Sequence, residues 1–133
     1  MDRVKEYKKS KNIHKTATLG DVVILNLNNV KIGKNTYVNS GQLYGGKNCK
    51  LEIGDNCKIG YNVHIKCITH DKKTLEIVEK PIKIGNNVWI CDNVFIKEGI
   101  TIGNNVIIGA NAVVTKNIED NKIVAGVPAR VIG

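Results

Sequence analysis

The sequence predicts an all-β chain that winds into a triangular coil of short parallel strands, with three six-residue segments to each coil. Composition is the first observation, because 19 Ile and 15 Val stand against 6 Leu and 5 Ala. Such β-branched side chains favour pleated strands over helices. The second observation is a six-residue repeat along most of the chain. The third is that Asn or Gly, which tolerate a positive φ, return at one place in that repeat.

Residues 1–16 carry six Lys or Arg against two acidic residues. We interpret them as a basic N-terminal arm or short helix that precedes a single coil domain at 17–133. Nucleic-acid binding is not favoured, because aromatic residues for base stacking are scarce. The segment lacks the apolar run of a secretory signal, and no stretch approaches the roughly 20 apolar residues of a membrane span. A cytoplasmic protein is therefore expected.

The repeat runs through five hexads without a slip from residue 84 to 113. An earlier block at 53–70 keeps the same frame, and 32–43 supplies two weaker copies. The first position is aliphatic and the fifth is small or β-branched, so these two should fill a narrow apolar prism while the second, third and sixth face outward. The fourth position, where a left-handed corner is expected, holds Asn35, Gly41, Asn56, Asn62, Asn87, Asn93, Gly99, Asn105 and Asn111.

Three segments depart from the repeat. A polar loop of about 71–81 should project from the coil, and Pro81 restarts the strand pattern. The frame also shifts at 44–48, and the chain after Val114 should form a C-terminal flap over the last coil. The four cysteines show no spacing typical of a zinc site, so reduced thiols and no metal are expected.

Only three histidines are present, so an imidazole base must be one of them. His70 takes the outward sixth position of its hexad and opens directly onto the projecting loop. A general base has to stand at the edge of a cleft, and His70 is the histidine placed to do so.

The hexads resemble the hexapeptide-repeat family, whose fold is a left-handed parallel β-helix and whose members are trimers with active sites between neighbouring prisms. Thr69-His70-Asp71, followed by the run from Pro81 to Ile90, resembles the acetyltransferase branch, in particular the maltose and galactoside O-acetyltransferases and the polysaccharide sugar O-acetyltransferases. The resemblance implies that His70 is the catalytic histidine and that a homotrimer forms. His70 and the cofactor residues then belong to sites shared between subunits.

The same resemblance implies acetyl-CoA as the co-substrate. The tail from Gly109 to Ile118 and from Ala125 to Arg130 is similar to the stretch that binds coenzyme A in that branch, and its matching positions are Ala110, Thr115, Lys116 and Arg130. Trp89, Cys91 and Asp92 would line the cofactor channel, with backbone N–H groups at 90–92 as oxyanion donors. Cys91 departs from the branch, because a glycine usually follows the Trp-Ile pair.

The function expected from these residues is acetyl-CoA-dependent O-acetylation of a small sugar or polysaccharide-precursor hydroxyl, with direct transfer in a ternary complex. Two alternatives stay open: N-acetylation of a nucleotide-linked amino sugar, and a non-catalytic scaffold, which the Cys91 substitution keeps open. A zinc-dependent carbonic anhydrase of this fold is nearly excluded, because His64 and His70 lie on successive sides and no third histidine is found in the repeats.

Overall fold

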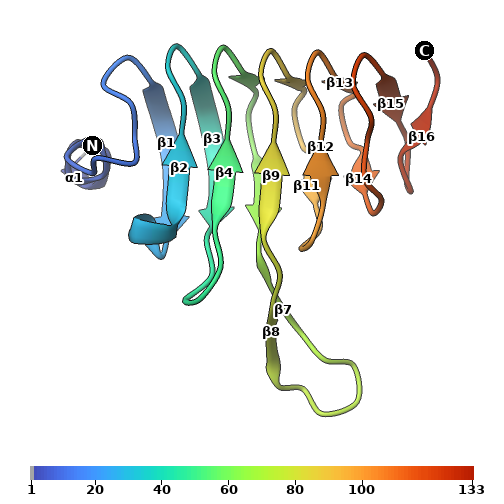
Figure 1. Ribbon diagram of the computed structural model, residues 1–133, viewed down its shortest axis with the longest axis horizontal. Helices are drawn as coiled ribbons and strands as arrows, with labels where there is room; N and C mark the ends of the chain where they lie inside the picture. Colours follow the sequence, from blue (N-terminus) through green and yellow to red (C-terminus); the bar gives the residue numbers. More distant parts are fainter. Residues whose placement is uncertain (1) are drawn as a thin grey trace.

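In a computed structural model that describes residues 2–133, the chain coils into a three-sided prism of parallel strands, with its ends at opposite ends of the prism (Figure 1). Two long strands, β1 (Thr18–Leu25) and β3 (Tyr37–Tyr44), bend around one edge, because the first part of β3 pairs with β5 and its last part with β6. They divide one ten-stranded sheet into a first face and a second face.

The strands of the three faces stack in register along the prism. The first face continues through β5 (Lys58–Ile59), β10 (Trp89–Ile90), β13 (Ile107–Ile108) and β15 (Ile123–Ala125), where β16 (Arg130–Val131) adds an antiparallel strand. The second face continues through β6 (Val63–Lys66), β11 (Phe95–Ile96) and β14 (Val113–Val114). The third face is a separate sheet of β2 (Val30–Ile32), β4 (Leu51–Ile53), β9 (Ile82–Ile84) and β12 (Thr101–Ile102).

Positive φ angles mark the corners, as the repeat predicts. All nine predicted corner residues have them, and the seven asparagines cluster between φ 55 and 66. The first-position isoleucines of the hexads that begin at 53, 59, 65, 84, 90, 96, 102 and 108 are each at most 2% exposed. Each such side chain removes enough apolar area from water to stabilise the prism by about 2 kcal/mol.

Gly41 is the exception to the predicted frame. It pairs with Val63, a fifth-position residue, and its φ is 126, so the coil slips by one residue here and Leu43 turns inward. A Cβ at Gly41 would stand 1.9 Å from the carbonyl oxygen of Val63. Only glycine fits this close approach of two strands.

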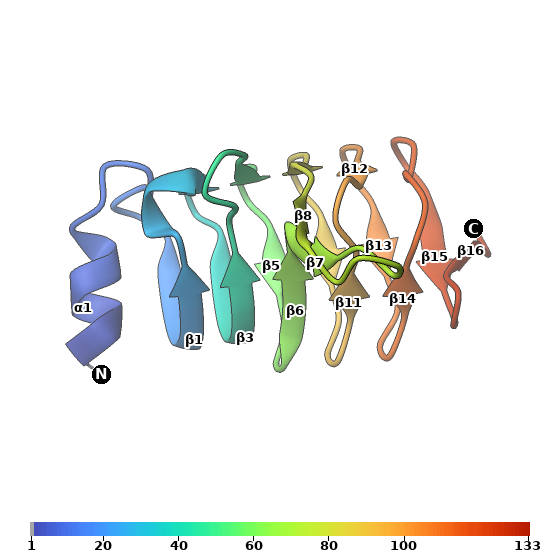
Figure 2. The same cartoon turned by 90° about the horizontal axis from the view of Figure 1, so that it is seen from below.

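The predicted basic arm is in part a short helix, α1 (Asp2–Lys8), that packs on β1 at one end of the prism (Figure 2). The Tyr7 hydroxyl accepts a hydrogen bond from the Ile24 amide at 3.1 Å, and Arg3 pairs with Asp21. Ile13 is already buried and bridges to Ile32, so the prism begins before residue 17. No helix within the described range is both long and apolar enough to cross a membrane.

One edge of the prism, between the second and third faces, carries extra residues in three successive coils. The first coil inserts a short 3-10 helix, η1 (Leu27–Asn29), the second a loop at 45–50, and the third an antiparallel hairpin of β7 (Ile68–His70) and β8 (Ile77–Glu79). Figure 1 shows this hairpin, hereafter the arm, standing well clear of the prism. The three insertions make this edge uneven, whereas regularly stacked hexads would leave it smooth.

Candidate active site

The arm presents His70 to solvent. In its register His70 lies opposite Ile77, and Ile68 lies opposite Glu79. Because side chains alternate along a strand and paired residues share a side, these four project from one side of the arm, while Thr69 and Val78 occupy the other. The predicted loop at 71–81 therefore begins too late. The chain leaves the prism at Ile68, because β7 pairs with β8 rather than with a strand of the coil. His70 consequently lies on the arm and not on the coil.

Asp71 organises the tip of the arm and does not act on His70. Its Oδ1 accepts hydrogen bonds from the amides of Lys73 at 2.8 Å and Thr74 at 2.9 Å. The Thr74 and Lys73 amides hold the pKa of this carboxyl below its usual value. Leu75 completes the turn with φ 62, a costly angle for a leucine.

Glu79 ties the arm to the loop of the neighbouring coil. Its two carboxylate oxygens accept hydrogen bonds from the amides of Lys47 at 2.7 Å and Asn48 at 3.0 Å. The hydrogen bond from the Lys47 amide has the larger effect and that from the Asn48 amide the next, and both lower the pKa of Glu79. Gly46 permits the approach, because a Cβ there would lie 2.9 Å from Glu79 Oε1. We call the Glu79 contacts with Lys47 and Asn48 the root clamp.

A pocket of about 660 Å³ opens beside the arm, on the side that carries His70. Its lining combines apolar side chains with a few polar groups: Leu25, Asn26, Lys47, Asn48, Ile68, Ile77 and Glu79. Ile68, Ile77 and Glu79 belong to the His70 side of the arm. His70 is not itself a lining residue, but its register partner Ile77 is, so we take this pocket as the candidate acceptor pocket.

Four of the predicted cofactor residues gather at a different edge, between the first and second faces. Trp89 is 50% exposed on β10, between Lys58 and Ile107 in register. Cys91 and Asp92 follow at the corner, and Ala110 lies at the same corner one coil later, where the Asn111 amide donates to the Asp92 carbonyl at 3.0 Å. Asp92 Oδ1 accepts from the Tyr61 amide at 2.8 Å, a stacking contact between coils.

Cys91 fits the corner without disturbing it. Its amide donates to the Ile108 carbonyl at 3.0 Å, and the glycines Gly60 and Gly109 occupy the equivalent places in the adjoining coils. Burial, followed by the charge of Asp92, raises the pKa of the Cys91 thiol. A protonated thiol is a poor nucleophile, so this environment does not prepare Cys91 for covalent catalysis.

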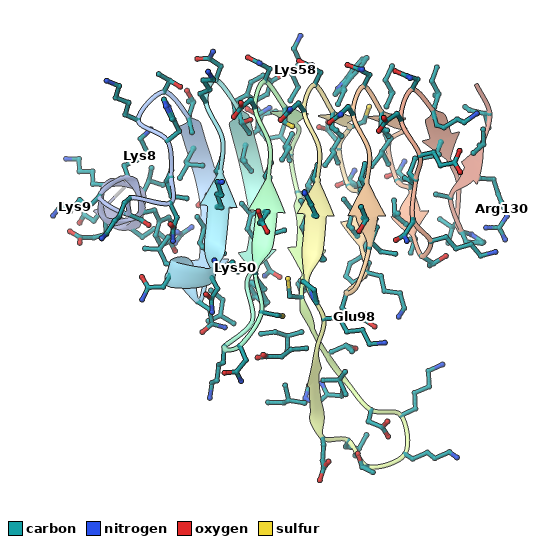
Figure 3. The ribbon with its side chains drawn as sticks, in the orientation of Figure 1. Lys8, Lys9, Lys50, Lys58, Glu98 and Arg130 are labelled. Carbon is teal, nitrogen blue, oxygen red and sulfur yellow. The ribbon has the colours of Figure 1, made fainter. Side chains whose placement is uncertain are left out.

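Lys116 and Arg130 lie apart from that corner, with Lys116 just beyond β14 at the edge between the second and third faces. They line a pocket of about 370 Å³ at the C-terminal end of the prism, with Ala129 and Val131 from the tail. Two cations in one pocket can bind phosphate groups. Thr115 is exposed directly before Lys116. Figure 3 shows Arg130 at the end of the prism opposite the N-terminal helix, with the arm between them.

The predicted site residues thus form three groups that one chain does not unite. His70 stands on an arm from the edge between the second and third faces, whereas Trp89, Cys91, Asp92 and Ala110 lie across the second face. Within residues 2–133, no group of three His, Cys, Asp or Glu side chains could hold a metal ion. The four cysteines, Cys49, Cys57, Cys67 and Cys91, are free thiols.

Sequence reasoning missed the root clamp and the candidate acceptor pocket. Glu79 and its partners are 31 and 32 residues apart along the chain, and the hexad period contains no information about contacts made by an insertion. The one available signal was the Gly45-Gly46 pair, since adjacent glycines often mark a close backbone approach.

Comparison with known proteins supports the repeat and the fold. Residues 81–116 match a family model described as bacterial transferase hexapeptide (six repeats). Galactoside O-acetyltransferase of Escherichia coli (strain K12) is 44% identical over 109 residues, which cover 78% of this chain and 53% of the relative. The chain spans about half the length of the curated relatives it matches, from 53% to 57%.

Two solved structures are similar over nearly the whole chain. A galactoside acetyltransferase in complex with coenzyme A is 36% identical, with TM-score 0.83, over 98% of this chain and 68% of its own. A hexapeptide-repeat acetyltransferase of Vibrio cholerae O1 biovar eltor, complexed with acetyl coenzyme A, is 27% identical, with TM-score 0.87, over 99% and 75%. The predicted all-β, left-handed parallel β-helix is thereby confirmed.

Proposed function

Because this chain belongs to the hexapeptide-repeat acetyltransferase family, we propose that it transfers an acetyl group from acetyl-CoA to a hydroxyl of a sugar-type acceptor. The observation that carries the proposal is the exposed His70 on an arm beside a pocket, in a chain that is 36% identical to a coenzyme A-bound galactoside acetyltransferase. A cytoplasmic location, with acetyl-CoA as a freely exchanging co-substrate, is part of the proposal.

His70 is the general base in this mechanism. A neutral imidazole accepts the proton of the acceptor hydroxyl as that oxygen bonds to the acetyl carbon. Of the backbone N–H groups at 90–92, that of Asp92 donates to the oxygen that becomes negative, because the Cys91 N–H already donates to the Ile108 carbonyl. When the carbon–sulfur bond breaks, His70 returns its proton to the departing sulfur, so the base is regenerated and no acyl-enzyme forms.

Lys116 and Arg130 are proposed to bind the phosphates of coenzyme A. Both side chains share the pocket at the C-terminal end of the prism. Trp89, Cys91, Asp92, Ala110 and Thr115 are proposed to line the path from that pocket toward the reacting thioester.

We further propose that the site is completed by a second copy of the chain in a homotrimer. Two outward columns carry exposed or half-buried apolar side chains: Tyr37, Trp89, Ile107 and Ile123 on the first face, and Val23, Phe95 and Val113 on the second. Packing one prism against another would cover these columns and bring the arm of one copy to the Cys91 corner of the next. Native mass spectrometry should then give three times the 14.6-kDa chain; a monomer at micromolar concentration contradicts it.

The proposed function is tested by incubating the protein with acetyl-CoA and a panel of galactosides, glucosides, maltose and amino sugars. Mass spectrometry of the products should find a sugar that has gained one acetyl group on oxygen. A product acetylated on nitrogen would favour the amino-sugar alternative.

Calorimetric titration with acetyl-CoA runs beside this assay. The Lys116→Ala/Arg130→Ala double variant should bind at least about tenfold more weakly than the parent protein, since each lost phosphate contact is worth more than about 1 kcal/mol. The matched control is Lys9→Ala, whose side chain pairs with Glu6 at the opposite end of the prism. Absence of binding to millimolar acetyl-CoA would overturn the proposal and favour the scaffold alternative.

A further inference from the structure

Positive charge is concentrated in the first part of the chain. Residues 1–50 contain ten Lys or Arg against three Asp or Glu, whereas 51–133 contain ten against nine. Nearly all of the formal net charge of +8 therefore arises in the first 50 residues. Because the coils stack in sequence order, this part of the chain forms one end of the prism (Figure 1).

Several of these cations are used within the fold. Arg3 pairs with Asp21, Lys9 with Glu6 at 3.0 Å, and the Lys8 ammonium donates to the carbonyls of Lys15 and Ala17. Figure 3 shows Lys8 and Lys9 at the helix end of the prism. Arg3, Lys8 and Lys9 are therefore engaged in contacts at the helix. The lysine side chains of the first two coils do not take part in these contacts.

Lys11, Lys31 and Lys34 are exposed and make no ion pair within residues 2–133. Together with His14 they line a pocket of about 370 Å³ that contains one acidic residue, Asp55. Asp55 is partly satisfied already, since its Oδ1 accepts a hydrogen bond from the Lys34 amide at 2.9 Å. We call this hollow the basic pocket.

Further lysines continue from the basic pocket toward the arm. Lys31 lies on β2, and Lys50 is exposed directly before β4, the strand that pairs with β2. Neighbouring strands are about 4.8 Å apart, so Lys31 and Lys50 lie on or next to adjoining strands, with one carboxylate, that of Glu52, opposite Lys31 in register. Lys47 comes next and lines the candidate acceptor pocket itself. Figure 3 shows Lys50 between the helix end of the prism and the arm.

The surface suits an acidic polysaccharide better than a membrane or a nucleic acid. The exposed large hydrophobic side chains within residues 2–50 are Val23, Leu25 and Tyr37, and none of them lines the basic pocket, so its lysines have no apolar anchor for a bilayer beside them. The basic pocket is lined by no aromatic residue on which a base could stack. What the surface does offer is a series of single cations at intervals, which matches carboxylate or sulfate groups repeated along a sugar chain.

We propose that the lysines from the basic pocket to the arm bind the anionic groups of an acidic polysaccharide, and that such a chain is the acceptor. This inference rests on the proposed function, because the bound chain would lead one of its hydroxyls to the arm and His70. Binding of the polymer does not itself require acetyl-CoA, so the two can be tested separately.

The test is calorimetric titration, without acetyl-CoA, with polygalacturonate oligomers and with dextran of similar length. Lys11→Gln/Lys31→Gln/Lys34→Gln is compared with Lys116→Gln/Lys122→Gln/Arg130→Gln, which removes the same charge from the opposite end of the prism. The first triple variant should weaken polygalacturonate binding on the order of tenfold, and the second by less than about twofold. Binding should also fall between about 50 and 500 mM salt as exposed charges are screened, and dextran should not bind.

Equal losses in both triple variants would mean a general charge effect, and a larger loss in the second would place the polymer in the Lys116 pocket; either overturns the inference. So would equal or tighter binding of oligo-dT or of phosphatidylserine vesicles. Polymer binding as expected without any acetyl transfer would contradict the proposed function alone. Transfer to neutral sugars without polymer binding would contradict this inference alone.

Discussion

Seven asparagines turn the corners of the prism, each with a φ near 60. This angle places Cβ close to a carbonyl oxygen, which costs most L residues roughly 1–2 kcal/mol, whereas asparagine offsets part of the cost through local hydrogen bonds. The corner angle, and not a contact of the side chain with the core, explains why the fourth position repeats along the sequence.

Asn87 provides the test at this scale. Its backbone N–H donates to the Asp55 carbonyl at 2.9 Å, and both Ala and Gly keep this hydrogen bond. We expect Asn87→Ala to lower the free energy of unfolding by about 1 kcal/mol, and Asn87→Gly to leave it unchanged or slightly higher. Urea denaturation followed by circular dichroism measures both. If Gly proves as harmful as Ala, the side chain rather than the corner angle is responsible.

These corners could be predicted because each is decided within its own hexad. Gly41 could not be placed, because the slip there depends on which residue of another strand lies opposite, Val63, and not on the local sequence. The same holds for His70. The sequence predicts that it lies next to the loop, but the chain leaves the prism at Ile68 because of pairing with β8, and a six-residue period contains no information about that pairing.

The arm is the element on which the proposed chemistry depends, and the root clamp fixes it. Two amides from the neighbouring coil bind one carboxylate of β8, while Cys67 anchors the other strand through its amide, which donates to the Tyr44 carbonyl at 2.9 Å. His70 lies only three residues beyond that anchor. Its position relative to the candidate acceptor pocket therefore depends on both contacts.

Loss of the root clamp should loosen the arm without unfolding the prism. In Glu79→Ala, trypsin should cleave faster after Lys72 and Lys73, which are exposed at the tip, while the thermal transition of the whole protein changes little. Glu76→Gln, an exposed change on the same arm, is the control. Equal cleavage rates in Glu79→Ala and the control would show that the clamp does not restrain the arm.

The root clamp should also respond to pH. The amides of Lys47 and Asn48 lower the pKa of Glu79 from the ordinary 4.5, so its stabilisation is fully present above pH 4.5 and is lost as pH falls through the lowered pKa. The Lys47 and Asn48 amide signals in nuclear magnetic resonance spectra should titrate with a midpoint below 4.5, and Glu79→Gln should abolish that titration. A midpoint at or above the ordinary value would contradict the hydrogen-bonding pattern.

Across the whole molecule, the coiling of one continuous hexad repeat distributes the proposed binding and catalytic residues over different edges and ends of the prism. Of the residues expected to hold coenzyme A, those from Trp89 to Ala110 lie at the edge between the first and second faces, whereas Thr115 and Lys116 follow β14 on the edge that also carries the arm, at the C-terminal end. The unpaired lysines of the described first coils lie at the other end. Spacing along the chain predicts the fold because strands stack in order. It does not predict which edge a residue occupies relative to another copy, so the assembly of the site could only be proposed.

Removal of the acceptor proton by His70 is tested by measuring kcat/KM for acetyl transfer by His70→Ala. Thr69→Ala is the matched control, because Thr69 lies on the same strand but on the opposite side of the arm. We expect His70→Ala to lose about 10²–10⁴-fold in kcat/KM, with acetyl-CoA binding unchanged, and Thr69→Ala to remain within about threefold of the parent protein. A His70→Ala protein that binds acetyl-CoA and transfers acetyl groups as fast as the control would contradict the claim.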